Sequence, residues 1–471
     1  MKNYSSILLD FTIRFPNWQN YIWPSIIFIG AILLAPFIAR QNLIAILAVA
    51  GILGVFGIIF FIRHPGIGFP ILIVACLLIP FSISTGTQTK INSAFLMMSL
   101  LVGAWLVEMF IINRQIKILP EPSIYAALLF VVSTIVSFGF GQLDWYPTKS
   151  ASLFAQIGQI MIMVLSMAAF ITAAHRMEKP IWLKSLVFVF IILGGIYSIA
   201  FIFPPLRHYV NRVFQRAVVD SLFWTWLIAI SFGQFWLNKS LSSIYRIGCL
   251  VISLSAIFTL LVTKQSWASG WLPAMAAVFV IIFLTKPKIG LIALFSFAII
   301  LLVRNQIIQG YVFVGDNEYS MVTRLEAWKI VFQIFGKNPL FGVGPANYYF
   351  YTPFYNIMGY SVSFNSHNNY VDLLAQVGIV GTLIFFWWAF ETARLGFSLR
   401  KENLDPFENA FVYSALGGLA GTLVAAFLGD WLLPFIYNIG MEGFRSSVLA
   451  WVFLGSLIFI KYQHKKQEFV I

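Results

Sequence analysis

The stretch that decides the fold is SHNNYVDLLAQVGIVGTLIFFWWAF, residues 366–390. It opens with polar side chains and then runs, beyond Gly378, into apolar residues without a single charge. Apolar runs of roughly 17–25 residues cross a bilayer as a helix, whereas core helices of soluble proteins are shorter and carry polar faces. The stretch therefore predicts a transmembrane helix whose first part is polar.

The rest of the chain has the same apolar character from end to end. Hydrophobic residues make up 60% of it and charged residues 10%, and the mean hydropathy is +0.87. Soluble domains carry about 25% charged residues. We therefore predict an all-α integral membrane protein with about 14 transmembrane helices. The predicted spans are 25–39, 43–62, 68–83, 92–112, 123–140, 151–173, 182–203, 221–237, 245–262, 269–285, 289–303, 369–390, 408–429 and 446–460.

These spans divide the chain into five regions. Residues 1–24 form a cytoplasmic or interfacial N-terminus, and residues 25–303 hold the first eleven spans. Residues 304–368 form a long periplasmic or extracellular loop that contains amphipathic helices. Residues 369–460 hold the last three spans, and residues 461–471 form a cytoplasmic tail.

The N-terminal region does not resemble a secretory signal. It is long and polar at its start, and no small-residue cleavage site follows the first span. We expect an interfacial helix with Trp18, Tyr21 and Trp23 at the level of the lipid headgroups.

Lysine and arginine indicate the orientation in the membrane. They gather in alternate connections, as expected if both termini are cytoplasmic. The outer exceptions lie mainly in two segments, 204–220 and 304–368. This bias accounts for most of the net charge of +13, so we expect a lipid bilayer and no nucleic acid as a partner.

Cysteine and histidine give no sign of a metal or a disulfide framework. Cys76 and Cys249 both fall inside apolar spans. The five histidines show none of the zinc-ligand spacings. We expect no metal site and no cofactor.

The first outer cluster, PPLRHYVNRVFQRAVVDSLFW at 204–224, holds three arginines. Arg212 and Arg216 would share a face on a helix, with Arg207 just before them. Guanidinium groups suit bidentate binding of phosphate, so a diphosphate site is one interpretation. Contact with lipid headgroups is the other, and Asp220 could pair with Arg216 in a purely structural role.

The long outer loop contains a predicted amphipathic helix. Thr323-Arg-Leu-Glu326 fits a capping box, which would place Arg324 in the first turn. Gly336-Lys-Asn-Pro339 would end the helix, and Gly342-Val-Gly344-Pro345 would form a tight turn. An apolar face would be formed by Leu325, Trp328, Phe332 and Phe335.

The next span opens with a candidate catalytic histidine. Ser366 is a possible N-cap, which would place His367 in the first helical turn. The helix dipole and nearby arginines disfavour imidazolium there, and a neutral imidazole is a good proton acceptor. Asn369, Asp372 and Gln376 continue a polar stripe that should face protein or water. A capping and packing cluster is the alternative.

Two further features flank these segments. Gly417 and Gly421 in the span 408–429 form a small-xxx-small pattern for close helix contact. Asp430 follows that span and could orient His367, balance the arginines, or be a simple helix-end carboxylate. Lys264, in TKQSWASGW at 263–271, either anchors the chain at the interface or belongs to the site.

Together these motifs resemble the core of the O-antigen ligase/polymerase superfamily, the Wzy and WaaL type of membrane glycosyltransferase. The family pattern is an Arg-x-x-x-Trp helix, a G-x-G turn, and a His-Asn-x-Tyr motif followed by Gly-x-x-Gly. In this chain the pattern corresponds to Arg324, Trp328, Gly342, Gly344, His367, Asn368, Tyr370, Gly378 and Gly381.

The resemblance implies transfer of a glycan from an undecaprenyl-pyrophosphate carrier to an acceptor glycan or lipid at the outer face of the bacterial cytoplasmic membrane. His367 would take the proton of the acceptor hydroxyl. Arg324, with Arg212 or Arg216 and with Arg207 beside them, would hold the pyrophosphate. Asn368, Tyr370, Asp372, Asp430 and Lys264 would support the site. The reaction would invert the anomeric centre and need no metal.

The resemblance has two departures and leaves three functions open. Lys264 stands where the family often has an arginine, and the stretch after Arg216 lacks the frequent Pro-Asn. The number of spans and the long loop favour a polymerase over a ligase. A transporter or flippase of lipid-linked sugars or small anions is the alternative, but it should carry charges near mid-bilayer, whereas these charges lie at the ends of spans.

Overall fold

The computed structural model describes residues 43–84, 90–264, 267–303 and 316–468. The chain divides into two units after Arg63, and in the first unit the structure describes helix α3 (Leu43–Arg63). The predicted span 25–39 and the expected interfacial N-terminus lie outside the described residues, as does the start of the long loop, 304–315.

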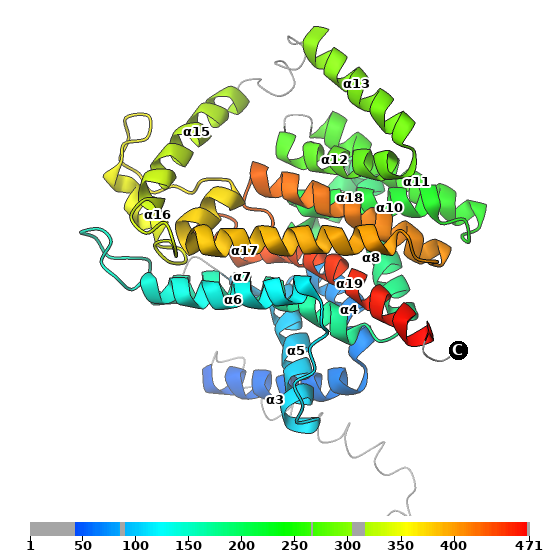
Figure 1. Cartoon of the computed structure of the whole chain (residues 1–471), viewed down its shortest axis with the longest axis horizontal. Helices are drawn as coiled ribbons and strands as arrows, with labels where there is room; N and C mark the ends of the chain where they lie inside the picture. Colours follow the sequence, from blue (N-terminus) through cyan, green and yellow to red (C-terminus); the bar gives the residue numbers. More distant parts are fainter. Residues whose placement is uncertain (1–42, 85–89, 265–266, 304–315, 469–471) are drawn as a thin grey trace, which may run out of the picture. The chain divides into compact units, whose positions relative to one another are not determined.

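The second unit is almost entirely helical (Figure 1). Its α-helices are α4 (Gly68–Leu77), α5 (Ser93–Val107), α6 (Pro122–Phe140), α7 (Leu153–Arg176), α8 (Pro180–Ile202), α9 (Pro204–Val213), α10 (Ser221–Leu237), α11 (Ser243–Phe258), α12 (Ala268–Thr285), α13 (Pro287–Val303), α15 (Asp316–Phe335), α16 (Tyr348–Tyr351), α17 (Asn369–Leu399), α18 (Pro406–Leu428) and α19 (Phe444–Glu468). The short helical turns are η1 (Pro65–Ile67), η2 (Glu108–Ile112), η3 (Arg216–Val219), η4 (Thr259–Thr263), η5 (Thr352–Phe354) and η6 (Gly440–Gly443). Strands β1 (Ser82–Ser84) and β2 (Lys90–Asn92) pair antiparallel, with Ile83 opposite Ile91.

Apolar helices confirm that this is a multi-pass membrane protein. Within the described residues, nine helices are long and apolar enough to cross a bilayer, or up to ten if one bent pair counts as a single span. Each predicted span in the described part of the chain coincides with a helix. Some of these helices are too short to count, α10 among them, so the predicted number of 14 is not confirmed.

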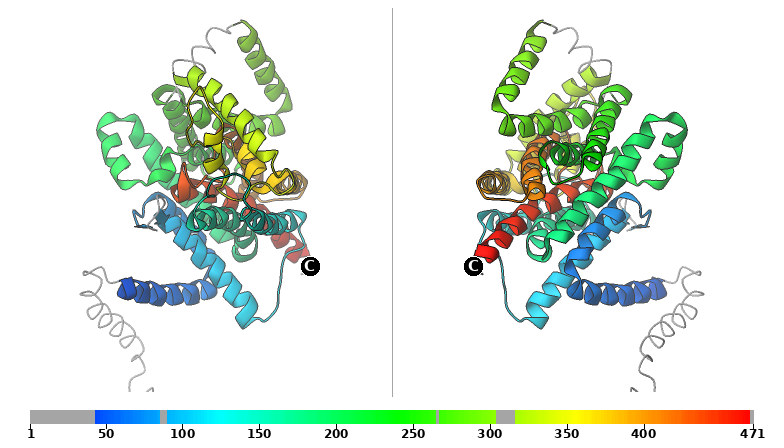
Figure 2. Two further views of the ribbon diagram at one scale, coloured as in Figure 1. Left: turned by 90° about the vertical axis from the view of Figure 1, so that its left-hand side faces the viewer. Right: turned by 90° about the vertical axis from the view of Figure 1, so that its right-hand side faces the viewer.

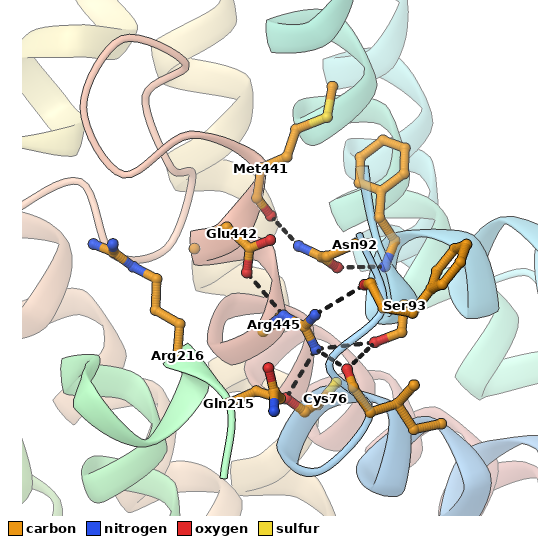
Figure 3. A network of polar contacts seen from close by, with 12 residues as sticks. Cys76, Asn92, Ser93, Gln215, Arg216, Met441, Glu442 and Arg445 are labelled. Atoms are coloured by element: carbon orange, nitrogen blue, oxygen red, sulfur yellow. Dashed lines mark hydrogen bonds and ion pairs between the residues drawn. The ribbon is translucent and has the colours of Figure 1, made fainter. Parts of the chain in front are cut away.

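One predicted span ends early. The helix expected over 68–83 stops at Leu77, and the chain then enters the small hairpin of β1 and β2. Arg445, at the start of α19, is 1% exposed and donates to the carbonyls that this helix end leaves open (Figure 3). Its guanidinium nitrogens lie within 3.5 Å of acceptors on Ala75, Cys76, Ile79, Phe81, Ser93 and Glu442.

The helices of the second unit form one bundle with two different ends. Figure 1 shows α15 and α16 at the end where α17 begins, and the C-terminus at the other end. Figure 2 shows these two ends facing the viewer in turn. The predicted close contact through α18 is confirmed, because a Cβ at Gly417 or Gly421 would lie 2.6 or 2.5 Å from a carbonyl oxygen of α12.

Helix α17 is broken at Gly378, which has φ 68° and ψ −171°. The break opens two helical hydrogen bonds, those from the amides of Ile379 and Val380 to the carbonyls of Ala375 and Gln376. The loop segment 339–344 fills the gap on both sides. The carbonyls of Pro339 and Leu340 accept from the amides of Ile379 and Val380 at 2.8 and 3.2 Å. The amides of Val343 and Gly344 donate to the two freed carbonyls of α17 at 2.8 and 3.2 Å. The four backbone groups that the break opens are therefore all paired, as expected inside a membrane protein.

The glycines of the family pattern make this insertion possible. Gly342 and Gly344 adopt φ of 72° and 93°, a region that favours glycine. A Cβ on Gly342 would lie 2.6 Å from the backbone of α17, and one on Gly378 would overlap the carbonyl of Leu340. The G-x-G turn and the Gly-x-x-Gly motif thus pack against each other where the segment 339–344 enters the break at Gly378. This contact is called the joint below.

Substitution of Gly378 by alanine is expected to prevent folding of this joint. Gly359→Ala is a matched control, because Gly359 also has a positive φ of 84°, but a Cβ at this position would meet no atom within 4 Å. Alanine is strained at both positions because φ is positive, at a cost of about 1–3 kcal/mol, but only at Gly378 would its Cβ also overlap backbone. Thermal unfolding in detergent should show a large decrease in unfolding temperature for Gly378→Ala and a small decrease for Gly359→Ala. Equal decreases would contradict a stabilising role for the loop insertion at Gly378.

Candidate active site

Helix α15 carries Arg324 and begins earlier than predicted. It starts at Asp316, so Thr323 and Arg324 lie well inside the helix and the predicted capping box is wrong. The local residues match a cap pattern, but the helix continues past them towards the N-terminus. Glu326 instead accepts a hydrogen bond from the amide of Met358 at 3.0 Å, and so fastens the middle of the long loop to α15. The helix ends at Phe335, as predicted from Gly336.

The buried face of α15 also differs from the predicted one. Leu325 and Phe332 are 46% and 45% exposed. The residues that pack into the core are Ala327, Ile330, Val331 and Ile334, against Tyr348, Tyr351 and Val371 among others. Leu325 and Phe332 of the predicted stripe are therefore exposed, whereas Trp328 of the same stripe packs against the core.

Arg324 and Trp328 lie one turn apart and hold two different segments. The Arg324 guanidinium donates through Nη1 to the carbonyl of Leu428, at the end of α18, at 3.0 Å. Trp328 donates through its indole to the carbonyl of Ser366 at 2.8 Å and packs edge-on against Phe427. The Arg-x-x-x-Trp motif thus fixes α15 to the end of α18 and to the loop that carries His367.

His367 lies just before α17 and not in its first turn. The N-cap is Asn368, whose side-chain oxygen accepts from the amides of Tyr370 and Val371 at 2.9 and 3.3 Å. Ser366 is therefore not the cap, and His367 has a left-handed backbone with φ 51°. Because the cap comes one residue after the histidine, the imidazole side chain starts outside the helix and can face the cavity described below.

A buried network beneath His367 fixes this unusual conformation. The Ser366 hydroxyl donates to Asp372 at 2.7 Å and accepts from the amide of Asn368 at 3.1 Å. Tyr348 donates a short hydrogen bond to the same carboxylate oxygen of Asp372. The polar stripe is fully buried, with Asn369 and Asp372 1% exposed and Gln376 2% exposed, so it faces protein as predicted.

The His367 ring faces Asn438 and, beyond it, Asp430. The Asn438 side-chain nitrogen lies 3.5 Å from Nδ1 of His367 and donates to Asp430 at 2.8 Å. Asp430 is 1% exposed and also accepts from the amide of Phe435 at 2.9 Å. Asn369 ties the same loop to α17 by accepting from the amide of Leu432 at 3.0 Å. Asp430 is therefore built into the site and is more than an exposed helix-end carboxylate.

The charges around His367 favour its neutral form. Burial lowers the pKa of the imidazole, and the positive charge of Arg324 lowers it further, while Asp430 acts in the opposite direction. Burial raises the pKa of Asp430. Burial also lowers the pKa of Arg324, with Asp430 opposing the change. An imidazole that is neutral at pH 7 beside a guanidinium can accept a proton while the cation binds an anion.

One cavity brings the histidine and the arginine together. It has a volume of about 420 Å³ and is lined by Arg324 and His367 with Thr323, Ile357, Phe364 and other residues of the loop. Among the described residues, the Nε of Arg324 has no hydrogen-bond partner. A donor of this cation is therefore available for a ligand in or beside the cavity.

Residues 246–386 match the family model described as O-antigen ligase. This part of the chain is similar to the O-antigen ligases. The match confirms the resemblance predicted from the motifs and supports a membrane enzyme of the ligase or polymerase type. A search of the curated proteins gave no match. The matched segment contains Arg324 and His367, whereas Asp430 and Asn438 follow it in the chain.

The arginines before the matched segment do not share one helix face. Helix α9 ends at Val213, so exposed Arg212 and Arg216 belong to different elements, which corrects the prediction. Arg216 pairs with Asp220 at 3.9 Å. Arg207 donates to the carbonyl of Phe201 at 2.8 Å and lies over the ring of that residue.

Lys264, which lies inside the matched segment 246–386, is a further cation near these arginines. Its ammonium lies 5.0–5.4 Å from the ring centres of Phe201, Trp224 and Trp267. Burial lowers the pKa of Lys264 to about 8, while the negative charge of Asp220 opposes the change. The ring centres of Trp267 and Trp431, the neighbour of Asp430, lie 5.9 Å apart. Lys264, Arg216 and Asp220 thus form a second charged cluster near the loop that carries Asp430.

No local pattern pointed to Asn438 or to the role of Tyr348. Asn438 lies in an irregular loop with no motif of its own, and its position depends on the fold of 430–443. Tyr348 follows the G-x-G turn, and only the insertion of that turn into α17 brings its hydroxyl to Asp372. By contrast, Tyr370 lies in the motif and donates to the carbonyl of Leu423 at 2.7 Å.

Proposed function

We propose that the protein transfers a glycan from an undecaprenyl-pyrophosphate carrier to the hydroxyl of an acceptor sugar, at the outer face of the bacterial cytoplasmic membrane. The observation that carries the proposal is the single cavity lined by His367 and Arg324. A proton acceptor and a fixed cation are the two groups that such a transfer requires.

The proposed reaction is a single displacement. His367 removes the proton of the acceptor hydroxyl as its oxygen attacks the anomeric carbon of the donor. The bond between that carbon and the pyrophosphate oxygen breaks, and its electron pair stays on the departing diphosphate. Arg324 stabilises the charge that develops there, with Arg216 or Lys264 as further cations. Attack opposite the leaving group inverts the anomeric centre, and the charge is balanced without a metal.

The length of α17 supports a site at headgroup level. The predicted span 369–390 would measure about 33 Å as a helix, close to the roughly 30 Å of a hydrocarbon core, and the charges of Glu391 and Arg394 follow its end. His367, which lies just before this span, would then be among the headgroups. A pyrophosphate attached to a membrane lipid is found at that depth. In this arrangement both termini are cytoplasmic.

The proposed activity can be tested with purified protein in lipid. The donor is an undecaprenyl-pyrophosphate-linked repeat unit, supplied first alone and then with a separate lipid or protein acceptor. A ladder of products from the donor alone would identify a polymerase, which the long loop and the predicted number of spans favour. Product only with the separate acceptor would identify a ligase. Carrier movement across liposomes without any product would overturn the proposal in favour of a transporter.

A further inference from the structure

A second hollow lies at the end of the bundle opposite His367. It has a volume of about 450 Å³ and forms where α10 and α12 end and α11 and α18 begin. Figure 2 shows this end of the bundle in its right-hand view. The cations that line the hollow are Lys239, Arg246 and Lys286, and its neutral polar residues include Asn409 and Tyr413.

The hollow is strongly positive. Three cations and no carboxylate line it. Within the described residues, none of Lys239, Arg246 and Lys286 forms an ion pair. A general excess of lysine and arginine on the inner side of a membrane protein explains cations in loops. It does not explain why three of them converge on one hollow without an acidic partner.

The hollow is also built on fixed side chains. Arg246 donates through Nε and Nη2 to the carbonyl of Phe235, at the end of α10, at 3.3 and 3.2 Å. Trp236 donates to Thr285 at 3.2 Å, which joins the ends of α10 and α12. The guanidinium and an aromatic wall are thus held in place before any ligand binds, so little order is lost on binding.

Arg400 connects this hollow to a neighbouring one. It lies over the ring of Tyr413 at 4.9 Å and donates to the carbonyl of Leu284 at 3.1 Å. Its Nε is buried and has no hydrogen-bond partner among the described residues. Arg400 also lines a neighbouring hollow of about 470 Å³, together with Arg394, Lys401 and the 46% exposed Phe397. An unpaired donor between two basic hollows indicates a missing acceptor.

We infer that these basic hollows bind the phosphate headgroup of an anionic phospholipid in the leaflet opposite the proposed active site. The cations match phosphate oxygens, and Tyr413 and Asn409 can donate further hydrogen bonds. Phe397 lines the hollow beside Arg400, and Ile244 lies at the start of α11. Both side chains are exposed and can contact acyl chains. Basic pockets between transmembrane helices are known to bind acidic lipid headgroups in other membrane proteins.

The test compares lipid binding by wild type and by the triple variant Lys239→Gln, Arg246→Gln, Lys286→Gln. A charge-matched control carries Lys117→Gln, Lys179→Gln and Lys288→Gln, three exposed lysines that do not line the hollow. Delipidated protein in neutral detergent is titrated with cardiolipin, with phosphatidylcholine and with inorganic phosphate, and bound lipid is counted by native mass spectrometry. Thermal unfolding without lipid confirms that each variant is folded.

We expect wild type and control to bind cardiolipin far more tightly than phosphatidylcholine. The triple variant should lose affinity on the order of 100-fold, since each cation near a phosphate headgroup is worth roughly fivefold. Equal binding by the folded triple variant and the control would overturn the inference. Saturation by inorganic phosphate at the same concentration would also overturn it, and would identify a soluble phosphate ligand.

Discussion

Replacement of His367 by alanine is expected to lower glycan transfer by a factor of about 10²–10⁴, the usual contribution of a general base. In the proposed mechanism the imidazole is the proton acceptor, and among the described residues it is the one histidine that lines the cavity with Arg324. Folding should be retained, because within the described part of the chain the ring makes one long hydrogen bond, at 3.5 Å to Asn438. Initial rates with the lipid-linked donor give the measurement.

The control for this prediction is His208→Ala. His208 is exposed on α9 and does not line the cavity, so its loss should leave the transfer rate within about twofold of wild type. A His367→Ala protein that elongates glycans at the wild-type rate would remove His367 from the mechanism. A monodisperse elution profile for both variants excludes misfolding as the cause of a lower rate.

The pH dependence of transfer follows from the same electrostatics. Burial and Arg324 lower the pKa of His367 below its ordinary value of 6.5. In the proposed mechanism the neutral form is active, so the rate should rise with pH through that lowered pKa and be constant by neutral pH. Asp430 raises the pKa of His367, so Asp430→Asn should move the acidic limb to still lower pH. A limb that moves to higher pH would contradict this arrangement of charges.

Replacement of Arg445 by methionine is expected to unfold the protein or prevent its purification. The guanidinium is 1% exposed and donates to the carbonyls of Ala75, Ile79 and Phe81, while its Nε pairs with Glu442 at 2.9 Å. Methionine fills a similar volume but leaves these acceptors and a carboxylate without their cation. Loss of one partner of a buried ion pair costs about 3–5 kcal/mol, a large part of the stability of most proteins.

Arg394→Met is the matched control for Arg445→Met. Arg394 also pairs with a glutamate three residues away, Glu391 at 3.1 Å, but its side chain is 63% exposed. Glu391 is 10% exposed, but the Arg394 guanidinium reaches solvent and makes no other ion pair or hydrogen bond among the described residues. Pairs with a solvent-exposed partner contribute about 0–1 kcal/mol, so this variant should unfold much closer to the wild-type temperature than Arg445→Met. Similar unfolding temperatures for the two variants would show that the Arg445 network has little effect on stability.

The helices could be predicted from sequence because their signals are local. Every predicted span in the described chain coincides with a helix, since apolar runs and Gly or Pro breaks determine such helices residue by residue. The exception after Leu77 is instructive. The end of α4 depends on Arg445, which lies far along the chain, and no local pattern contains that information.

The site was only partly predictable for the same reason. Arg324 and His367 could be identified because a family pattern contains both. The conformation of His367 could not, because it depends on the buried contact of Ser366 with Asp372. The function of the glycines was also invisible, since Gly342 and Gly378 are separated in the chain and meet only where the loop enters α17.

The joint between the loop and α17 has a consequence for biosynthesis. In the proposed topology, the segment 339–344 leaves the ribosome and is exported before α17 enters the translocon. Alone in the membrane, residues 369–399 can close their own two hydrogen bonds at Gly378 and form an unbroken helix. The exported loop must then return and replace those bonds with its own. Insertion into the bilayer and maturation of the active site are therefore separate events, and a fully inserted chain can still be an immature enzyme.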